Sequence, residues 1–473
     1  MTRTITEQAE LWGLRSEVVA ELGNRLSGFW ERFAGCVATK TRDSQAYGLA
    51  YISGLLRIDR ARTMAEIGRQ TGVSEQNMQH FISNSPWQGQ RIVQQVQQEI
   101  STRTEFHGGV LVIDESADEK AGLHSAGSGR QHNGRLGKID VAQVGVFATL
   151  VRDHHWSWVD GELFLPEAWF SEAYAEKRTA SGIPTERRFE TKVELAWRLI
   201  ERIDAGPITF EAVTFDSLYG RSVWLRDQCR AQNIEYYADI PRDGWVYLTP
   251  PTAEFPVGKR GKLLKKKPIW TGSNALKAES LLDDPQTEWH TLTLRPSERG
   301  YLVADFACRQ VWTTRSDGTV VAETLLLRRD SDRVTYSLTN APAESPLQLL
   351  AERKSQRSFV ERSIQDAKSD LGWDDFRAIK YRAWEHQLAF TVLASWFVAE
   401  TRLDWERDMP ADPTLLDHYQ TDVLPTLSMA NVRDMLRAAM PLPQLSTDDA
   451  IALVLKHLDN RTRSRRSRLK RRM

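Results

Sequence analysis

Two apolar stretches of the sequence lead directly into an aspartate that could take part in metal chemistry. Residues 110–113 (VLVI) precede Asp114, and the stretch FEAVTF precedes Asp216. A carboxylate at the exit of a buried strand lies at the edge of a sheet, where open α/β folds commonly bind ligands. Either acid could instead begin a turn or cap the next element. The sequence therefore predicts two strands and leaves two roles open for the acids that follow them.

These two acids could act together in metal binding if their strands are neighbours in one sheet. Asp114 and Asp216 would then lie at the same edge, where two close carboxylates repel and raise each other's pKa. A divalent cation relieves that repulsion. Hard oxygen ligands select Mg²⁺ or Mn²⁺ rather than Zn²⁺. The alternative is that both residues only cap turns.

A third acid is offered by a predicted helix in the stretch ERKSQRSFVERSIQDAKSDLGW. Arg357 precedes Glu361 by four residues and Lys368 follows it by seven, so the three side chains share one helix face. A surface helix with ion pairs between residues four apart would show the same spacing. This helix is predicted over residues 346–370.

The order of the elements around the two aspartates indicates the fold. Strands are predicted at 109–114, 140–151 and 156–165, followed by a helix at 190–204 and a strand at 208–216. A helix at 222–233 and a strand at 235–240 come next. This order, with three successive strands followed by helix, strand, helix and strand, is that of an RNase H-like sheet. We therefore predict an α/β fold, with an RNase H-like catalytic core that a β-rich insertion interrupts and helical regions at both ends.

The periodicity of the chain predicts five regions. The first resembles a helix-turn-helix, because Gly72 follows one amphipathic segment and Ser74 can cap a second, whose inner face holds Met78 and Phe81. An ordinary helical hairpin is the alternative. The regions are a helical DNA-binding domain (1–105), the first part of the core (106–240), the β-rich insertion (241–345), the second part of the core (346–404) and a helical C-terminal region with a basic tail (405–473).

Charge is distributed unevenly along a chain of 473 residues whose net charge is zero. Residues 461–473 carry eight Lys and Arg and no acid, which leaves −8 for the rest of the chain. A second basic run covers 258–268. Basic clusters on an acidic body suggest a polyanionic partner, although such runs are often only solvated tails.

Composition also excludes some classes of protein. No apolar run approaches the roughly 20 residues of a membrane span, so no membrane partner is expected. The N-terminus lacks a signal-peptide core, and the three cysteines have no metal-ligand or redox spacing. We expect a cytoplasmic protein.

Taken together, the three acidic stretches resemble the DDE transposases of bacterial insertion sequences, in the group marked by Y-x2-R-x3-E-x6-K. Arg357, Glu361 and Lys368 match that signature, and Lys354 stands where the group has Tyr. The resemblance covers roughly residues 48–400. It includes the segments NSPW, DSLYG, KAGLHSAGSGRQHNGRLGKIDVAQVGV and FRAIKYRAWEHQLAFTVLASWFV, and the β-rich insertion before the glutamate.

The resemblance implies phosphodiester hydrolysis followed by strand transfer at the ends of a mobile element. Asp114 would bridge two Mg²⁺ or Mn²⁺ ions, and Asp216 and Glu361 would each complete one site. The implied partners are double-stranded DNA, both the terminal inverted repeats and the target, and a second copy of the chain in a synaptic homodimer. The implied setting is the nucleoid of a bacterial cytoplasm.

Residues expected to contact DNA surround this triad. Lys354 is expected to be exposed on the face of the Glu361 helix that binds phosphate, and glycines permit close backbone approach in the stretch 122–138. Trp312 could stack on a displaced base, although core packing is an alternative. The expected DNA contacts are Arg357, Lys368, Lys354, Arg130, Arg135, Lys138, Lys120 and Trp312.

Two other functions remain open from the sequence. One is a different RNase H-like nuclease, such as a junction resolvase. The long insertion and the Arg–Glu–Lys helix argue against it. The other is a domesticated transposase that binds DNA without cutting, which the three intact acids argue against.

Overall fold

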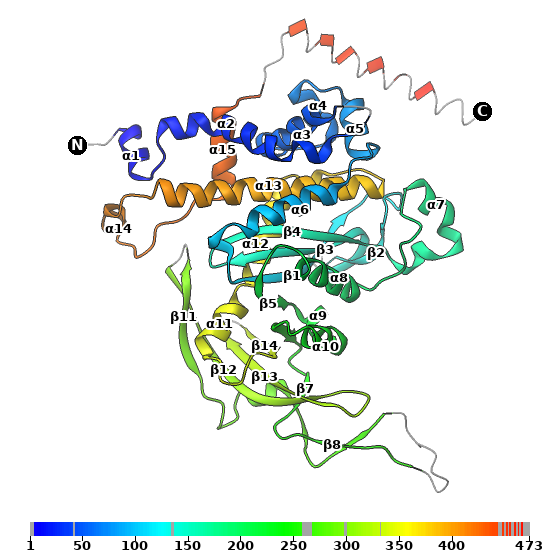
Figure 1. Cartoon of the computed structure of the whole chain (residues 1–473), viewed down its shortest axis with the longest axis vertical. Coiled ribbons are helices and arrows are strands. Elements are labelled where there is room, and N and C mark those ends of the chain that lie inside the picture. The colour runs from blue at the N-terminus through cyan, green and yellow to red at the C-terminus, as the bar shows by residue number, and fades with distance from the viewer. Residues whose placement is uncertain are drawn as a thin grey trace.

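One large mixed sheet carries most of the architecture (Figure 1). The computed structural model describes residues 4–40, 43–133, 137–257, 267–297, 300–331 and 333–442, with scattered positions between 447 and 466. Twelve strands form the sheet in the order β10-β7-β12-β13-β14-β6-β5-β1-β3-β2, with β11 paired to β12 and β4 paired to β3.

Five strands at one side of the sheet form the catalytic core. They follow the order β4-β3-β1-β5-β6, in which β3 is antiparallel to β1 and to β4, while β5 and β6 run parallel to β1. This arrangement confirms the predicted RNase H-like sheet. The strands are β1 (Gly109–Glu119), β3 (Lys138–Arg152), β4 (His155–Phe164), β5 (Phe210–Phe215) and β6 (Tyr236–Ile240).

Strand β1 is longer than the sequence predicts. It was expected to end at Asp114 but continues to Glu119, because β3 pairs with it along its whole length, from Val110 with Val151 to Glu119 with Ala142. β2 (Gly129–Asn133) pairs with the start of β3, so part of the glycine-rich stretch is a hairpin. The acid therefore lies within a paired strand rather than at its end.

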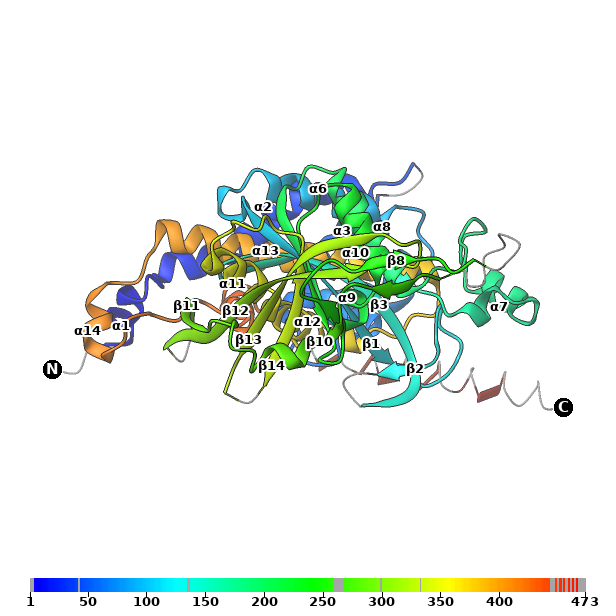
Figure 2. The same cartoon turned by 90° about the horizontal axis from the view of Figure 1, so that it is seen from below.

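The β-rich insertion extends the core sheet instead of forming a separate one. β14 (Val334–Thr339) is antiparallel to β6, and β13 (Val320–Arg329) and β12 (Gly300–Thr314) follow outward. Viewed from below, these strands lie in front of the long helix α13 (Figure 2). The remaining strands are β7 (Trp245–Tyr247), β10 (Ala275–Lys277), β11 (His290–Ser297) and a separate pair, β8 (Thr252–Glu254) with β9 (Ile269–Thr271).

Helix α13 (Tyr381–Asp408) runs between the N-terminal helices and the sheet (Figure 1). Most of its residues are buried, because it packs on β4 below and on N-terminal helices above. Other helices of the fold are α1 (Ile5–Leu11), α2 (Ser16–Phe33), α3 (Gln45–Arg57), α6 (Gly89–Ser101), α7 (Ala175–Ala180), α8 (Lys192–Asp204), α10 (Val223–Ala231), α14 (Thr414–Tyr419) and α15 (Met429–Ala439). Among the described helices, none has the length and apolarity to cross a membrane.

The two helices predicted around Gly72 are present as α4 (Met64–Thr71) and α5 (Glu75–Ser83). Gly72 ends α4 with a φ of 74°, a conformation that glycine adopts without strain. The Ser74 hydroxyl caps α5 by accepting a hydrogen bond from the Asn77 backbone N–H. Met78 and Phe81 are buried, as expected. The outer face of α5 is exposed at Glu75, Gln76, Gln79 and His80.

The helix predicted over 346–370 is two helices. α11 (Leu347–Ser355) and α12 (Ser358–Ser369) are separated by Gln356 and Arg357, and Arg357 is the N-terminal cap residue of α12. Phe359 and Val360 of α12 belong to the same buried cluster as Val110 and Val112 of β1. The break therefore lets the second helix pack on the core sheet beside Asp114.

Candidate active site

Asp114 and Asp216 are brought together by the pairing of two parallel strands. Ile113 of β1 pairs with Phe215 of β5, so the two aspartates occupy the next position on adjacent strands. Neighbouring strands lie about 4.8 Å apart, which places the two backbones side by side. Asp216 also caps α9 (Ser217–Gly220), where its Oδ1 accepts a hydrogen bond from the Leu218 N–H at 2.8 Å. The capping role and a position at the sheet edge therefore coexist.

The alternation of β1 decides which of its acids faces the Glu361 helix. Asp114 lies on the same strand face as Val110 and Val112, which pack against α12. Glu115 lies on the opposite face. Its Oε1 is 2.8 Å from Lys192 Nζ, and its Oε2 accepts a hydrogen bond from the Tyr219 hydroxyl at 2.6 Å. Asp114 is thus the acid of β1 that can act with residues of α12.

A cavity of about 710 Å³ joins the acids of three elements. Asp216 and Glu361 both line it, Asp114 is not among the described lining residues, and Glu361 is exposed in the first turn of α12. Arg357 lines the same cavity one helical turn before Glu361, and its Nη2 is 3.7 Å from Asp114 Oδ2. The residues lining the cavity are Asp216, Ser217, Asp239, Ile240, Arg242, Arg328, Asp330, Arg333, Val334, Thr335, Tyr336, Lys354, Arg357, Ser358 and Glu361.

The electrostatics of the two aspartates favour a cation beside them. Burial raises the pKa of Asp114 to about 7; Arg357 opposes this shift and the nearby charge of Asp216 adds to it. Burial also raises the pKa of Asp216, again against the effect of Arg357. A positive charge placed between these carboxylates would stabilise their ionised forms. The oxygen donors fit a hard divalent ion.

Glu361 lines the same cavity as Asp216. Within the part of the chain that the structure describes, the three acids are not a group whose ligand atoms all lie within 4.8 Å of one another. Arg357 lies between Asp114 and Asp239, with its Nη2 3.7 Å from Asp114 Oδ2 and its Nε 3.9 Å from Asp239 Oδ2. The fold therefore makes Asp114 and Asp216 neighbours through strand pairing and places Glu361 on the cavity that Asp216 lines.

Lys354 does not lie on the surface, contrary to expectation. It is only 5% exposed and forms an ion pair with Asp239 at the wall of the cavity. Burial lowers the pKa of Lys354, and Asp239 opposes that shift. Burial would raise the pKa of Asp239, but Lys354 and Arg357 outweigh it and hold that pKa below its usual value. The expectation of an exposed lysine was wrong because α11 packs this residue against β6.

The other lysines near the triad bind protein groups. Lys368 is 9% exposed; its Nζ donates a hydrogen bond to the Ala117 carbonyl at 2.8 Å and lies 3.2 Å from Asp118 Oδ1. Lys120 Nζ donates to the Phe376 carbonyl at 3.2 Å. Lys368 contacts β1 at Ala117, and Lys120 directly follows the end of β1, so both lysines lie beyond Asp114. Neither is among the described residues that line the cavity.

The remaining residues expected to contact DNA lie apart from the cavity. Arg130 and Lys138 are exposed on the β2–β3 hairpin, where Lys138 Nζ is 3.0 Å from Asp140 Oδ2. Trp312 is half-buried in β12, opposite Ala322 and Tyr247. Arg135, most of the basic tail 461–473 and most of the basic run 258–268 lie outside the described residues.

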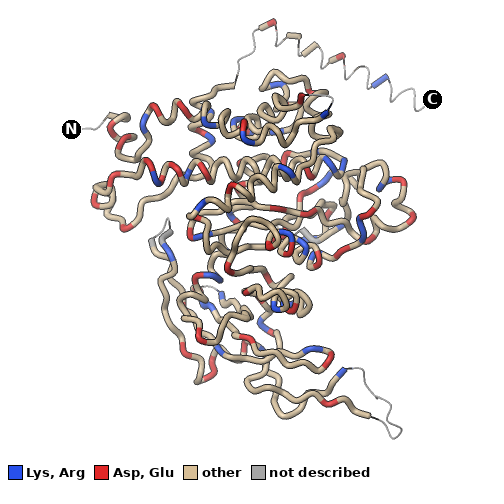
Figure 3. Tube along the Cα trace, viewed as in Figure 1, with Lys and Arg blue, Asp and Glu red and all other residues tan. Residues whose placement is uncertain are grey.

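Several cavity residues were missed by the sequence analysis. Asp239 ends the apolar stretch EYYAD, so the rule that found Asp114 and Asp216 could have found it. Arg328 lies near the end of β13, Arg333 lies in the turn between β13 and β14, and Arg242 follows β6. Nothing in their local sequence marks these arginines, because the pairing of β14 with β6 brings them to the site. Acidic and basic residues are interspersed along the described chain, so charge alone does not single out these positions (Figure 3).

Comparisons with known proteins found a matching family model and a similar protein. A family model described as DDE superfamily endonuclease matches residues 32–301, which is more than half of the chain and includes Asp114 and Asp216. The probable transposase for insertion sequence element IS701 of Microchaete diplosiphon is 24% identical over 352 residues. That alignment covers 72% of this chain and 78% of the relative.

Proposed function

The chain belongs to the DDE superfamily of endonucleases, and we propose that it is an insertion-sequence transposase. In this proposal it binds the ends of its element, cleaves the DNA with divalent metal ions and joins the 3′-hydroxyl ends to target DNA. The observation that carries the proposal is the register of β1 with β5, which makes Asp114 and Asp216 neighbours beside a cavity that Glu361 also lines. The similarity to the IS701 transposase supports the same function.

Asp114, Asp216 and Glu361 are the proposed catalytic and metal-binding residues, and two Mg²⁺ or Mn²⁺ ions are the proposed cofactors. When bound, such ions activate the attacking water or 3′-hydroxyl and stabilise the leaving oxygen. The raised pKa values of Asp114 and Asp216 support a cation at this place. Because Glu361 is exposed at the start of α12, its side chain is free to turn toward the aspartates when the ions bind.

Cationic side chains around the cavity are proposed to hold the DNA backbone. Arg357 lies near Asp114 and Asp239, and Arg333 is exposed at the turn of the insertion. An arginine can bind a phosphate through two parallel hydrogen bonds. Arg130, Lys138 and the outer face of α5 are proposed as contacts farther along the DNA.

Lys368, Lys120 and Lys354 have protein partners, so we propose that they position the residues around the triad. We further propose a homodimer that synapses two element ends in the nucleoid of a bacterial cytoplasm. No observation favours a junction resolvase or an idle DNA-binding protein.

Cleavage of the element's own ends tests the proposed function. The purified protein is incubated with duplexes carrying the sequences that flank its gene, and with duplexes in which those sequences are scrambled, in Mg²⁺ or in EDTA. We expect Mg²⁺-dependent breaks at the element ends only. A protein that shifts the native ends without cleaving them would be an idle binder, and cleavage of four-way junctions irrespective of sequence would indicate a resolvase.

A further inference from the structure

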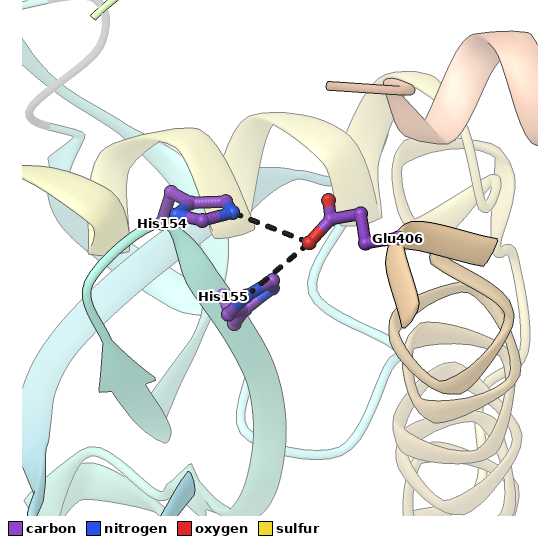
Figure 4. Close-up of side chains that lie close together, drawn as sticks. All are labelled: His154, His155 and Glu406. Carbon is purple, nitrogen blue, oxygen red and sulfur yellow. Dashed lines mark hydrogen bonds and ion pairs between the residues drawn. The ribbon is translucent and has the colours of Figure 1, made fainter. Parts of the chain in front are cut away.

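Two histidines and a glutamate meet at a place that the proposed DNA chemistry does not use. His154 lies in the turn between β3 and β4, His155 begins β4, and Glu406 lies near the C-terminal end of α13. Figure 4 shows both imidazoles directed at the same carboxylate oxygen. One ligand atom from each of the three residues lies within 4.8 Å of the others, and this is the one such group among the described His, Cys, Asp and Glu residues.

The separations in this cluster are long for hydrogen bonds but fit a shared metal ion. Glu406 Oε2 is 3.4 Å from His154 Nε2 and 3.5 Å from His155 Nε2. Hydrogen bonds from nitrogen to oxygen are usually about 2.7–3.2 Å long. Around a tetrahedral Zn²⁺ with bonds of about 2.0–2.2 Å, a nitrogen and an oxygen ligand are separated by roughly 3.4 Å. The two nitrogen–oxygen separations therefore match those of ligands around one ion, and the two imidazoles offer nitrogens within 4.8 Å of each other.

A second observation points to an absent partner at the same place. The other carboxylate oxygen, Glu406 Oε1, is buried and has no hydrogen-bond partner. A buried oxygen without a partner is costly, and a bound cation would remove that cost. The Arg402 guanidinium is the nearby positive charge that opposes a cation, whereas Asp153 adds a negative charge beside the histidines.

We propose that His154, His155 and Glu406 form a binding site for Zn²⁺ or a similar borderline divalent cation. Two imidazoles with one carboxylate suit Zn²⁺ rather than Mg²⁺, which prefers an all-oxygen site. The three side chains leave a fourth tetrahedral position for water. The ion fastens the turn between β3 and β4 to the end of α13, two elements about 250 residues apart in the sequence.

This site is separate from the proposed catalytic ions. In the antiparallel pairing of β1 with β3, Asp114 lies opposite Phe147, whereas the turn with His154 follows the other end of the pairing, beyond Val151. Phe147 and Val151 are four residues apart on β3, which corresponds to roughly 13 Å along the strand. The two kinds of ion can therefore be distinguished by the variants that abolish their binding.

Zinc binding to the full-length protein tests the proposal. Metal-free protein is titrated with Zn²⁺ by calorimetry in excess Mg²⁺, which keeps hard-oxygen sites occupied, and Co²⁺ absorption then reports whether the ion is tetrahedral. Glu406→Gln is the main variant because it preserves the shape of the side chain, with His155→Ala as the second. His290→Ala, which removes an exposed histidine of β11, is the matched control.

We expect one equivalent of Zn²⁺ on the wild type and on the His290→Ala control. Loss of a direct ligand should weaken this binding by more than about tenfold, since even changes to groups around a metal site cost about 10–100-fold. Zn²⁺ should also raise the melting temperature of the wild type but not that of Glu406→Gln. Equal zinc binding by wild type and Glu406→Gln, or none by the wild type, would overturn the proposal. Neither measurement depends on DNA cleavage, so the result is independent of the proposed transposase function.

Discussion

Replacing Lys354 with methionine should destabilise the protein as well as impair its reaction. The lysine side chain is 6% exposed and forms an ion pair with Asp239, whose side chain is 14% exposed. Methionine keeps most of the apolar stem and removes only the charge, so packing is largely preserved. The substitution therefore isolates the cost of leaving Asp239 without its lysine.

The surroundings of Asp239 set the size of this effect. Removing one partner of a buried ion pair typically costs about 3–5 kcal/mol, because the other charge stays buried. Here Asp239 keeps a hydrogen bond from the Ser337 hydroxyl at 2.6 Å and a more distant charge, with Arg357 Nε at 3.9 Å. We therefore expect Lys354→Met to lower the free energy of unfolding by about 2–3 kcal/mol, at or below the lower end of that range.

Urea unfolding of four variants, Lys354→Met, Lys277→Met, Asp239→Asn and the Asp239→Asn/Lys354→Met double variant, measures this cost. Lys277→Met is the control, because Lys277 is half-exposed and lies 3.7 Å from Glu279, and it should change the unfolding free energy by less than about 0.5 kcal/mol. In an Asp239→Asn background, Lys354→Met should cost at least about 1 kcal/mol less than in the wild type. A Lys354→Met protein as stable as the Lys277→Met control would refute the reasoning.

Three further changes should have separable outcomes. Alanine at Asp114, Asp216 or Glu361 should abolish cleavage and spare binding of element ends, measured by gel shift and nicking on the same DNA; loss of binding by all three would argue against a metal-binding role. Deleting 461–473 should flatten the slope of log K against log salt by about 0.9 for each phosphate that the tail neutralises, and an unchanged slope would show that the tail does not bind DNA. Burial raises the pKa of Asp366 from 3.8 to about 6, against the effect of Arg362. Between these values the folded state holds a proton that the unfolded state releases, so stability falls by up to about 3 kcal/mol as pH rises through this window. Asp366→Asn should remove that fall. The reasoning is wrong if the unfolding free energy of the variant, measured with urea from pH 4 to 7, follows the same profile as that of the wild type.

Local signals were sufficient where neighbouring residues decide the structure. The turn between α4 and α5 depends on the φ of Gly72 and on the hydroxyl of Ser74, and both were readable from the sequence. The strand order of the core was predicted because apolar strands buried on both faces have a strong local pattern. The prediction that the strands carrying Asp114 and preceding Asp216 are neighbours was confirmed by the pairing of Ile113 with Phe215.

Distant partners decided the features that the sequence analysis missed. β1 continues past Asp114 because β3 pairs with it, although the residues after Asp114 look like a turn. The insertion joins the core sheet through the pairing of β14 with β6, and only this pairing carries Arg328 and Arg333 to the cavity. A surface charge and a buried one cannot be told apart by helical spacing, which is why Lys354 was expected to be exposed.

The sequence by itself thus determined the order of the elements, the acids that follow two apolar core stretches and the helix turn that carries Arg357 and Glu361. These features follow from short-range periodicity and from residue types, which act over a few positions of the chain. The tertiary structure decided which charges face the cavity, which are neutralised inside the fold, and that His154 and His155 meet Glu406. Such encounters join residues far apart in the chain, and they depend on strand register and helix packing, which no local pattern encodes.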